Sequence, residues 1–217
     1  AGLVLFELVA QNTSITRAWS MIVHLVNTYL LLGSIILTAW WSSRGDSQKF
    51  HWPGISGFIL LTGLAGLLVL GASGAVTALG DTLFPASTLA EGLKQDSSPT
   101  AHIFIRLRVL HPVIATAIGV YLWGAVVWLR RQADGPLFRK TSTLLLALFA
   151  VQLVLGTINV ILLAPVWLQM VHLVVSDLIW GALVLTTDIL FTGGHLMEGA
   201  ADESIKIGVE KAAAKNP

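Results

Sequence analysis

The chain has 217 residues, of which 55% are hydrophobic and 12% are charged, and its formal net charge is +1. A soluble domain carries about 25% charged residues, so this composition excludes an ordinary soluble protein and indicates an integral membrane protein. The small net charge argues against nucleic acid binding, and the lack of cysteine excludes disulfides, thiolate ligands and iron–sulfur clusters in this chain. Any metal must be held by histidine, carboxylate or methionine.

Five segments are apolar and long enough to cross a bilayer, which takes about 20 residues. In chain order they cover residues 19–41, 54–78, 103–129, 143–163 and 167–191. Residues 1–10 resemble the end of a truncated helix, since no initial Met, basic region or signal-peptide cleavage site is visible. We predict a long polar connection at 79–101 and a tail at 192–217 that is a short soluble helix or disordered. The expected fold is an all-α integral membrane bundle with five full spans and one partial helix.

Basic residues predict the orientation of these spans. Arg44 and Lys49 lie in the first polar loop, and a second loop is more basic still, with Arg130, Arg131, Arg139 and Lys140. Because Lys and Arg favour cytoplasmic loops, both loops and the C-terminal tail are predicted to be cytoplasmic. The chain is then a multi-pass protein, surrounded by lipid, in a bacterial-type cytoplasmic (inner) membrane.

Three histidines are predicted to lie inside the membrane, near its outer face. The pattern Trp-x-x-x-Val-His-Leu-Val occurs at 19–26 and again at 167–174, and it places His24 and His172 five residues after a tryptophan. At 1.5 Å per residue this is a depth of roughly 8 Å. His111 lies at a similar depth, eight residues into the span that begins at Ile103. Ionisable groups are costly in hydrocarbon and usually functional there, so their shared depth indicates a common site.

Imidazole is the commonest side-chain metal ligand, and haem iron accepts it axially. His111 and His172 lie two helices apart at one depth, and they are the best candidate pair for bis-histidine ligation. The alternative for each is a packed histidine bonded to a neighbouring helix. His24 has no second deep histidine left to pair with it. His51, His102 and His195 are predicted to be surface residues.

Several neighbours could serve such a site. Arg106 and Arg108 could pair with haem propionates, although both could instead extend to the membrane interface. Ser176 and Gln169 lie one helical turn from His172 and could orient its ring, as Asn27 and Thr28 could for His24. Asp177 could instead meet Asn159 or Gln152 of the preceding helix, and Glu7 could be interfacial.

Several spaced segments resemble the haem A synthase family. They are Val23–Thr28, Gly74–Thr77 with Gly80-Asp81, Leu110-His111, and Val166–Leu173. The resemblance covers nearly the whole chain. It implies eight membrane helices in two pseudo-symmetric four-helix halves, each with a pair of haem-facing histidines. Residues 1–41 would then be the last two helices of the first half, the first of them partial, and residues 54–191 a complete second half.

The resemblance also implies an activity, the oxidation of a methyl group of haem O to the formyl group of haem A in support of cytochrome oxidase assembly. His111 and His172 would ligate a haem b that relays electrons, and His24 would be one axial ligand of the substrate haem. Its partner histidine and the family's catalytic glutamate would lie upstream of Ala1. Arg108 occupies the matching position in the second half and cannot replace that glutamate, while Asp81 matches an acid of uncertain role. The chain alone is therefore expected to bind haem without completing the reaction.

Two alternatives stay open from the sequence. The chain could be a bis-histidine b-type cytochrome that transfers electrons without catalysis. It could also be a transporter or scaffold without haem, but the deep polar groups gather on one side only, which disfavours a proton pathway. Haem O synthase is a candidate partner and a homo-oligomer is allowed, whereas the sequence does not name the electron acceptor.

Overall fold

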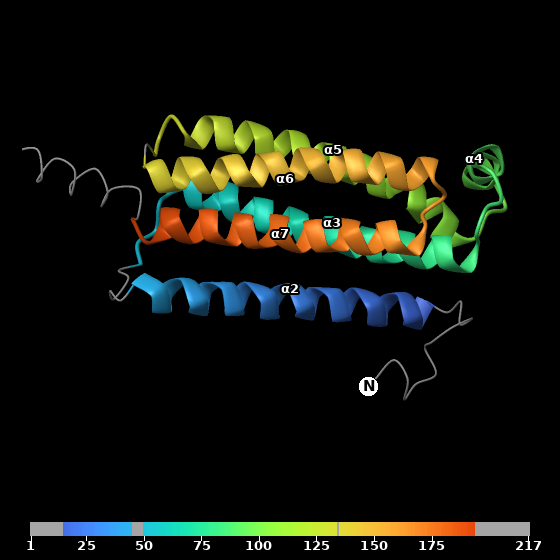
Figure 1. Ribbon diagram of the computed structural model, residues 1–217, viewed down its shortest axis with the longest axis horizontal. Coiled ribbons are helices and arrows are strands. Elements are labelled where there is room, and N and C mark those ends of the chain that lie inside the picture. The colour runs from blue at the N-terminus through green and yellow to red at the C-terminus, as the bar shows by residue number, and fades with distance from the viewer. Residues whose placement is uncertain (1–14, 45–49, 134, 194–217) are drawn as a thin grey trace, which may run out of the picture.

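The computed structural model describes residues 15–44, 50–133 and 135–193, and all of its regular structure is helical. Figure 1 shows five long helices and one short one. The long helices are α2 (Ile15–Arg44), α3 (Ile55–Leu83), α5 (Ile103–Leu129), α6 (Pro136–Ile161) and α7 (Val166–Phe191), and the short one is α4 (Leu89–Ser97). Each long helix is apolar and long enough to cross a membrane. The predicted all-α multi-pass membrane fold is confirmed for this part of the chain.

Two predicted boundaries are wrong. The segment 79–101 is largely helical, because α3 continues to Leu83 and α4 follows it. The side chain of Thr88 caps α4 by accepting the Glu91 backbone N–H (3.2 Å), and Glu91 in turn accepts the Ser87 backbone N–H (2.8 Å). Helix α6 begins at Pro136 rather than at residue 143, since proline at the first helical position costs no hydrogen bond. The predicted partial helix at 1–10 and the tail after Gly193 lie outside the described residues.

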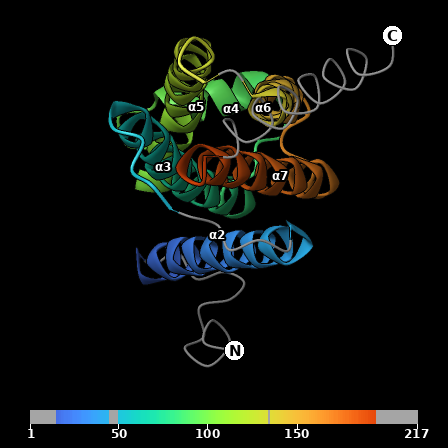
Figure 2. The same cartoon turned by 90° about the vertical axis from the view of Figure 1, so that its left-hand side faces the viewer.

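Helices α3, α5, α6 and α7 form a four-helix bundle (Figure 2). Around the bundle, α5 packs on α3, α3 on α7, α7 on α6, and α6 on α5. Helices α5 and α7 therefore face each other across a diagonal. Helix α2 packs outside this bundle against α3 and α7. The division of the chain into two pseudo-symmetric halves stays a prediction.

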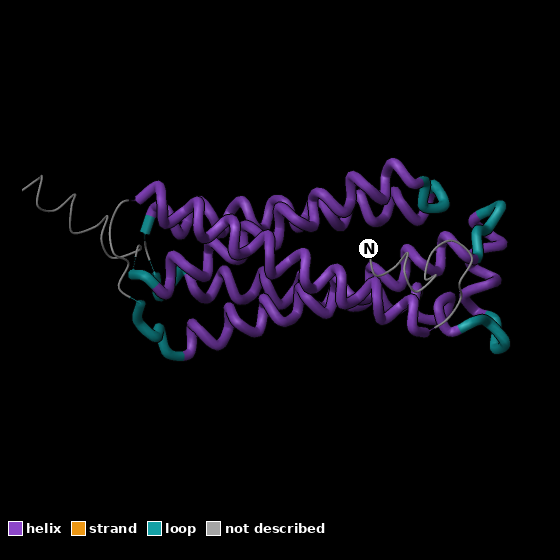
Figure 3. Tube along the Cα trace, turned by 90° about the horizontal axis from the view of Figure 1, so that it is seen from below, coloured by secondary structure: helices purple, strands orange, loops and turns teal. Residues whose placement is uncertain are grey.

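The connections gather at the two ends of the bundle (Figure 3). We call one end the α4 end, because α4 packs there on α5, and the other the Arg130 end. At the Arg130 end, the Arg130 guanidinium donates to the hydroxyls of Ser142 (3.0 Å) and Thr143 (2.6 Å) on α6. These bonds tie the end of α5 to the first turns of α6.

Packing is uneven along the bundle. Near the Arg130 end, α5, α6 and α7 bury large apolar side chains, among them Leu129, Phe138, Leu145, Leu183 and Ile189. Toward the α4 end, by contrast, no residue of α5 is fully buried between Ile105 and Leu122, none of α6 after Phe149, and none of α7 between Leu168 and Ile179. The protein's own side chains thus fill the α4 half of the bundle less completely. His111 and His172 both lie in this half.

Candidate functional site

The structure brings the side chains of His111 on α5 and His172 on α7 together across the bundle, with the rings inclined edge to face. Their ring centroids are 6.5 Å apart and their planes are inclined at 70°. A metal–imidazole bond is about 2 Å, and the bonding nitrogen lies about 1 Å from the ring centre, so two imidazoles on opposite sides of one iron have centroids about 6 Å apart. The observed separation therefore suits two axial ligands of one haem iron.

The ring of His111 is held with one nitrogen available for a metal. Its Nδ1 lies 2.9 Å from Ser73 Oγ on α3. The Ser73 hydroxyl donates its single hydrogen to the Leu70 carbonyl (2.7 Å), so toward His111 it acts as an acceptor. Nδ1 then carries the proton, and the lone pair of Nε2 is free to bind iron.

Glycines make room for both imidazoles. A Cβ atom on Gly74 of α3 would lie 3.1 Å from His111 Cε1, which is tighter than ordinary van der Waals contact. A Cβ atom on Gly156 of α6 would lie 3.3 Å from His172 Cε1. Each histidine ring thus lies against a helix that lacks a side chain at that point.

His172 is fixed through its backbone but not through its ring. Gln152 of α6 donates from Nε2 to the His172 carbonyl (2.9 Å). Among the described residues the buried His172 Nδ1 has no hydrogen-bond partner. Such an unpaired nitrogen is expected if the His172 ring forms its hydrogen bond at Nδ1 only when Nε2 holds a ligand.

The residues predicted to orient His172 have other partners. Ser176 lies 2.5 Å from the Tyr29 hydroxyl of α2, and Gln169 donates to the Ala164 carbonyl (2.6 Å). Gln152, one expected partner of Asp177, donates instead to the backbone of His172. Sequence reasoning thus missed Ser73 and Gln152 as the polar residues in contact with the two histidines.

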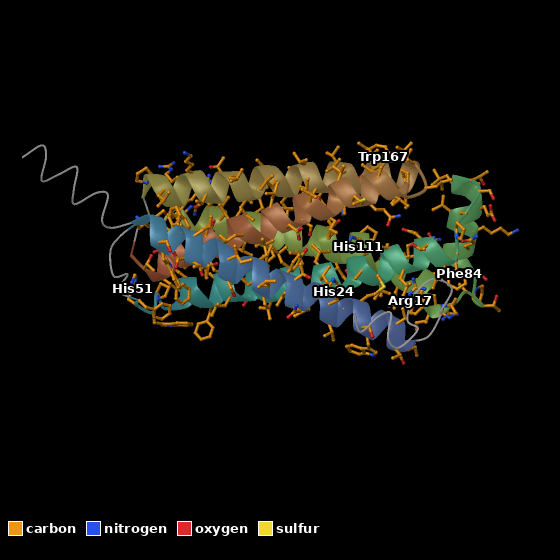
Figure 4. All side chains as sticks on the ribbon, turned by 60° about the horizontal axis from the view of Figure 1, so that its bottom comes forward. Arg17, His24, His51, Phe84, His111 and Trp167 are labelled. Atoms are coloured by element: carbon orange, nitrogen blue, oxygen red, sulfur yellow. The ribbon has the colours of Figure 1, made fainter. Side chains whose placement is uncertain are left out.

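His24 lies on α2, outside the four-helix bundle that carries this pair, and Figure 4 labels it together with His111. Helix α2 packs on the bundle through Ala18, Tyr29 and Gly33. His24 lies on the opposite face and is exposed, together with Asn27 and Thr28. Thr28 donates to the His24 carbonyl (2.9 Å), and within the described part of the chain no hydrogen bond holds the imidazole. A role for His24 would therefore involve groups on the far side of α2 from His111 and His172.

Arg108 is engaged by two carboxylates at the α4 end. Its guanidinium lies 3.0 Å from Asp81 Oδ1 at the end of α3 and 2.5 Å from Asp96 Oδ1 on α4. Arg106 is exposed and donates to the Pro99 carbonyl. The Asp81–Arg108–Asp96 cluster was not predicted from the sequence. A propionate role for either arginine stays a prediction, and for Arg108 it would have to compete with these ion pairs.

His111 and His172 would hold such a haem between them, and a haem held by two histidines would supply one-electron transfer. The partly buried positions of the two rings, their separation and the incomplete packing around them define the class. The chain is an all-helical membrane protein with a candidate bis-histidine haem site.

The comparisons with known proteins give the family. The model of the cytochrome oxidase assembly protein family COX15-CtaA, which is the haem A synthase family, matches residues 1–184. The chain belongs to this family, and the resemblance seen in the sequence is confirmed.

Two curated relatives come from two strains of Thermus thermophilus, and both are named protoheme IX farnesyltransferase. They are 44% and 43% identical to this chain over 210 residues. The match covers 96% of this chain but 34% of each relative, so the chain spans about a third of their length. No solved structure matches this chain.

Proposed function

We propose that this chain is the haem b-binding part of a haem A synthase, a membrane oxidoreductase that converts a methyl group of haem O to a formyl group. The observation that carries the proposal is the facing pair His111 and His172, with 6.5 Å between ring centroids. Membership of the cytochrome oxidase assembly family supports a role in making that oxidase, and haem A synthesis is the reaction that best accounts for a haem-binding member.

The chain's own residues have distinct parts in this proposal. His111 and His172 hold the haem b, which when bound supplies reversible one-electron chemistry. Ser73 keeps the proton of His111 on Nδ1, and Gly74 and Gly156 leave space for the rings. The apolar helices around the pair exclude water, which favours electron transfer over side reactions of the iron.

His24 would bind the substrate haem on the opposite face of α2. Its exposed position beside Asn27 supports a site completed by further helices, because a histidine facing lipid is costly. The partner histidine and the catalytic glutamate would come from residues upstream of Ala1. The described part of the chain contains one glutamate, Glu91, which lies on the exposed surface of α4.

The name of the Thermus relatives describes a longer protein that transfers a farnesyl group to protohaem. We propose that a protohaem carrying a farnesyl group is the class of substrate for the region of those proteins that this chain matches. The name thus supports a close relation between haem O synthesis and haem O oxidation, with haem O synthase as the proposed partner.

The proposed orientation of the chain follows the positive-inside rule. The Arg130 end lies in the cytoplasm of a bacterial-type membrane, and the α4 end lies outside.

A reduced-minus-oxidised spectrum of the purified chain tests the haem site. We expect a low-spin b-type signal that is lost in His111→Ala and in His172→Ala. The matched control is His102→Ala, which changes an exposed histidine of the same helix region and should keep the signal. If both deep variants keep the wild-type spectrum, the proposed pair is wrong.

A second assay separates the enzyme from an electron-transfer cytochrome. The haem is extracted after the protein has been incubated with haem O and a reductant in air. We expect no haem A from this chain and haem A from a longer chain that carries the upstream helices. Haem A made by this chain alone would contradict the upstream position of the catalytic glutamate, and none from the longer chain would favour the cytochrome.

A further inference from the structure

Three buried polar atoms on α6 and α7, in the α4 half of the bundle, have no partner among the described residues. They are His172 Nδ1 on α7 and two amide oxygens on α6, Gln152 Oε1 and Asn159 Oδ1. Buried polar atoms are normally hydrogen-bonded, so a cluster of orphans marks a place where bonds form in another state of the protein. Two of the three are obligate acceptors, and an imidazole nitrogen can be a donor.

These residues lie along one line of contact between α6 and α7. Gln152, Gly156 and Asn159 are spaced by four and three residues and share a face of α6. This face of α6 meets His172, because Gln152 donates to the His172 carbonyl and Gly156 lies against the His172 ring. Helices α6 and α7 are antiparallel neighbours joined by a short turn, so Asn159 lies nearer the α4 end than Gln152.

The direction of the His172 side chain favours one of the two oxygens. In an α-helix each Cα–Cβ bond tilts toward the N-terminus, while the carbonyls point toward the C-terminus. The N-terminus of α7 is at the α4 end, so the imidazole extends toward Asn159 and the carbonyl toward Gln152. The Gln152 bond to the carbonyl agrees with this geometry.

We propose that Asn159 is a positioning residue for His172, with its Oδ1 accepting a hydrogen bond from Nδ1–H when Nε2 binds haem iron. This inference rests on the proposed haem site at His111 and His172. Asn159 would do for His172 what Ser73 does for His111, which is to keep the proton on Nδ1 and present Nε2 to the metal. An acceptor on the distal nitrogen also makes a ligating imidazole more basic, which stabilises ferric over ferrous iron.

The test uses the haem-loaded protein in detergent with Asn159→Leu, Asn159→Asp and, for comparison with the rival acceptor, Gln152→Ala. Asn159→Leu keeps the side-chain volume and removes the acceptor, and Asn159→Asp keeps an acceptor oxygen. Gln152→Ala removes a residue of the same face whose observed bond goes to the backbone. The two readouts are haem loss to a scavenging apoprotein and the midpoint potential from a spectroelectrochemical titration.

We expect Asn159→Leu to lose haem about 10-fold faster or more, the usual effect of removing an outer partner of a ligand, and to raise the midpoint potential. Asn159→Asp should retain haem as the wild type does, with a midpoint potential at or below the wild-type value. Gln152→Ala, which loses the bond to the His172 backbone carbonyl, should shift the potential less than Asn159→Leu does. If Asn159→Leu does not fold, Asn159→Ala takes its place, and helical circular dichroism establishes folding in each case.

Wild-type haem retention and potential in Asn159→Leu would overturn the inference. It would also be overturned if Asn159→Asp behaved like Asn159→Leu, or if Gln152→Ala alone shifted the potential, since Gln152 would then be the acceptor. These results differ from a failure of the proposed haem site, in which the wild-type chain itself would show no b-type spectrum sensitive to His111→Ala and His172→Ala.

Discussion

Replacing Arg108 with glutamine should release α4 from the bundle. The Arg108 guanidinium joins Asp81 of α3 and Asp96 of α4, and the side chains of all three residues are largely buried, with 15%, 20% and 24% of their surface exposed. Gly92 is the one fully buried residue of α4, so little apolar contact holds this helix in place. The ion pairs are therefore expected to carry much of its attachment.

The size of the effect follows from this partial burial. Exposed ion pairs contribute up to about 1 kcal/mol, and breaking a fully buried pair costs about 3–5 kcal/mol. For Arg108, between these limits, we take about 2 kcal/mol, which corresponds to a roughly 30-fold increase in the open state of α4. Lys94 is an exposed residue of α4 and offers trypsin a cleavage site there.

Limited trypsin digestion in detergent measures this opening, because cleavage of a briefly opened segment follows its open population. We expect Arg108→Gln to be cut at Lys94 about 30-fold faster than the wild type. The control Arg106→Gln removes an exposed arginine whose bond goes to the Pro99 carbonyl, and its cleavage should rise less than about fivefold. Equal cleavage rates in Arg108→Gln and the wild type, or equal acceleration in both variants, would refute the reasoning.

Two further predictions concern packing. Gly74→Ala should weaken haem retention several-fold in the scavenging assay, because its Cβ would lie 3.1 Å from His111 Cε1. The control Gly124→Ala, which has open space around the new Cβ, should retain haem as the wild type does. Equal retention in the two variants would contradict the role of Gly74. Tyr29→Phe should lower the thermal unfolding midpoint by about 2–4 °C, because it removes the 2.5 Å bond to Ser176, worth about 1 kcal/mol, while keeping the ring stacked on Trp180. A midpoint equal to that of the wild type would show that the bond contributes nothing.

The sequence predicted the spans well, because a membrane helix is defined by the local composition of about 20 residues. Residues 103–129 and the end of the last span at Phe191 agree with α5 and α7. The prediction failed where polar residues are helical. At the start of α4, the Thr88 side chain accepts the Glu91 backbone N–H, and the Glu91 side chain accepts the Ser87 backbone N–H. In the first turns of α6, Ser142 and Thr143 accept hydrogen bonds from Arg130. Hydropathy does not register such bonds.

At the candidate site, the sequence indicated which histidines to consider but not their partners. His111 and His172 were paired by depth, and the structure places them together. Ser73 and Gln152 had no signal of their own, since single polar residues in apolar helices are common. The available clue was a glycine near each of these residues. Gly74 follows Ser73 directly, and Gly156 lies about one helical turn after Gln152.

The sequence by itself determined that this chain lies in a membrane and which segments can cross it, and it predicted that three histidines share one depth. These properties depend on residue type and on distance along a helix, so no fold is needed to obtain them. Only the tertiary structure decided which nitrogen of His111 is free, that His24 lies on the far face of α2, and that Arg108 is paired with Asp81 and Asp96. The physical reason is that these facts rest on contacts between different helices, whose rotation and register are set by packing of the whole bundle.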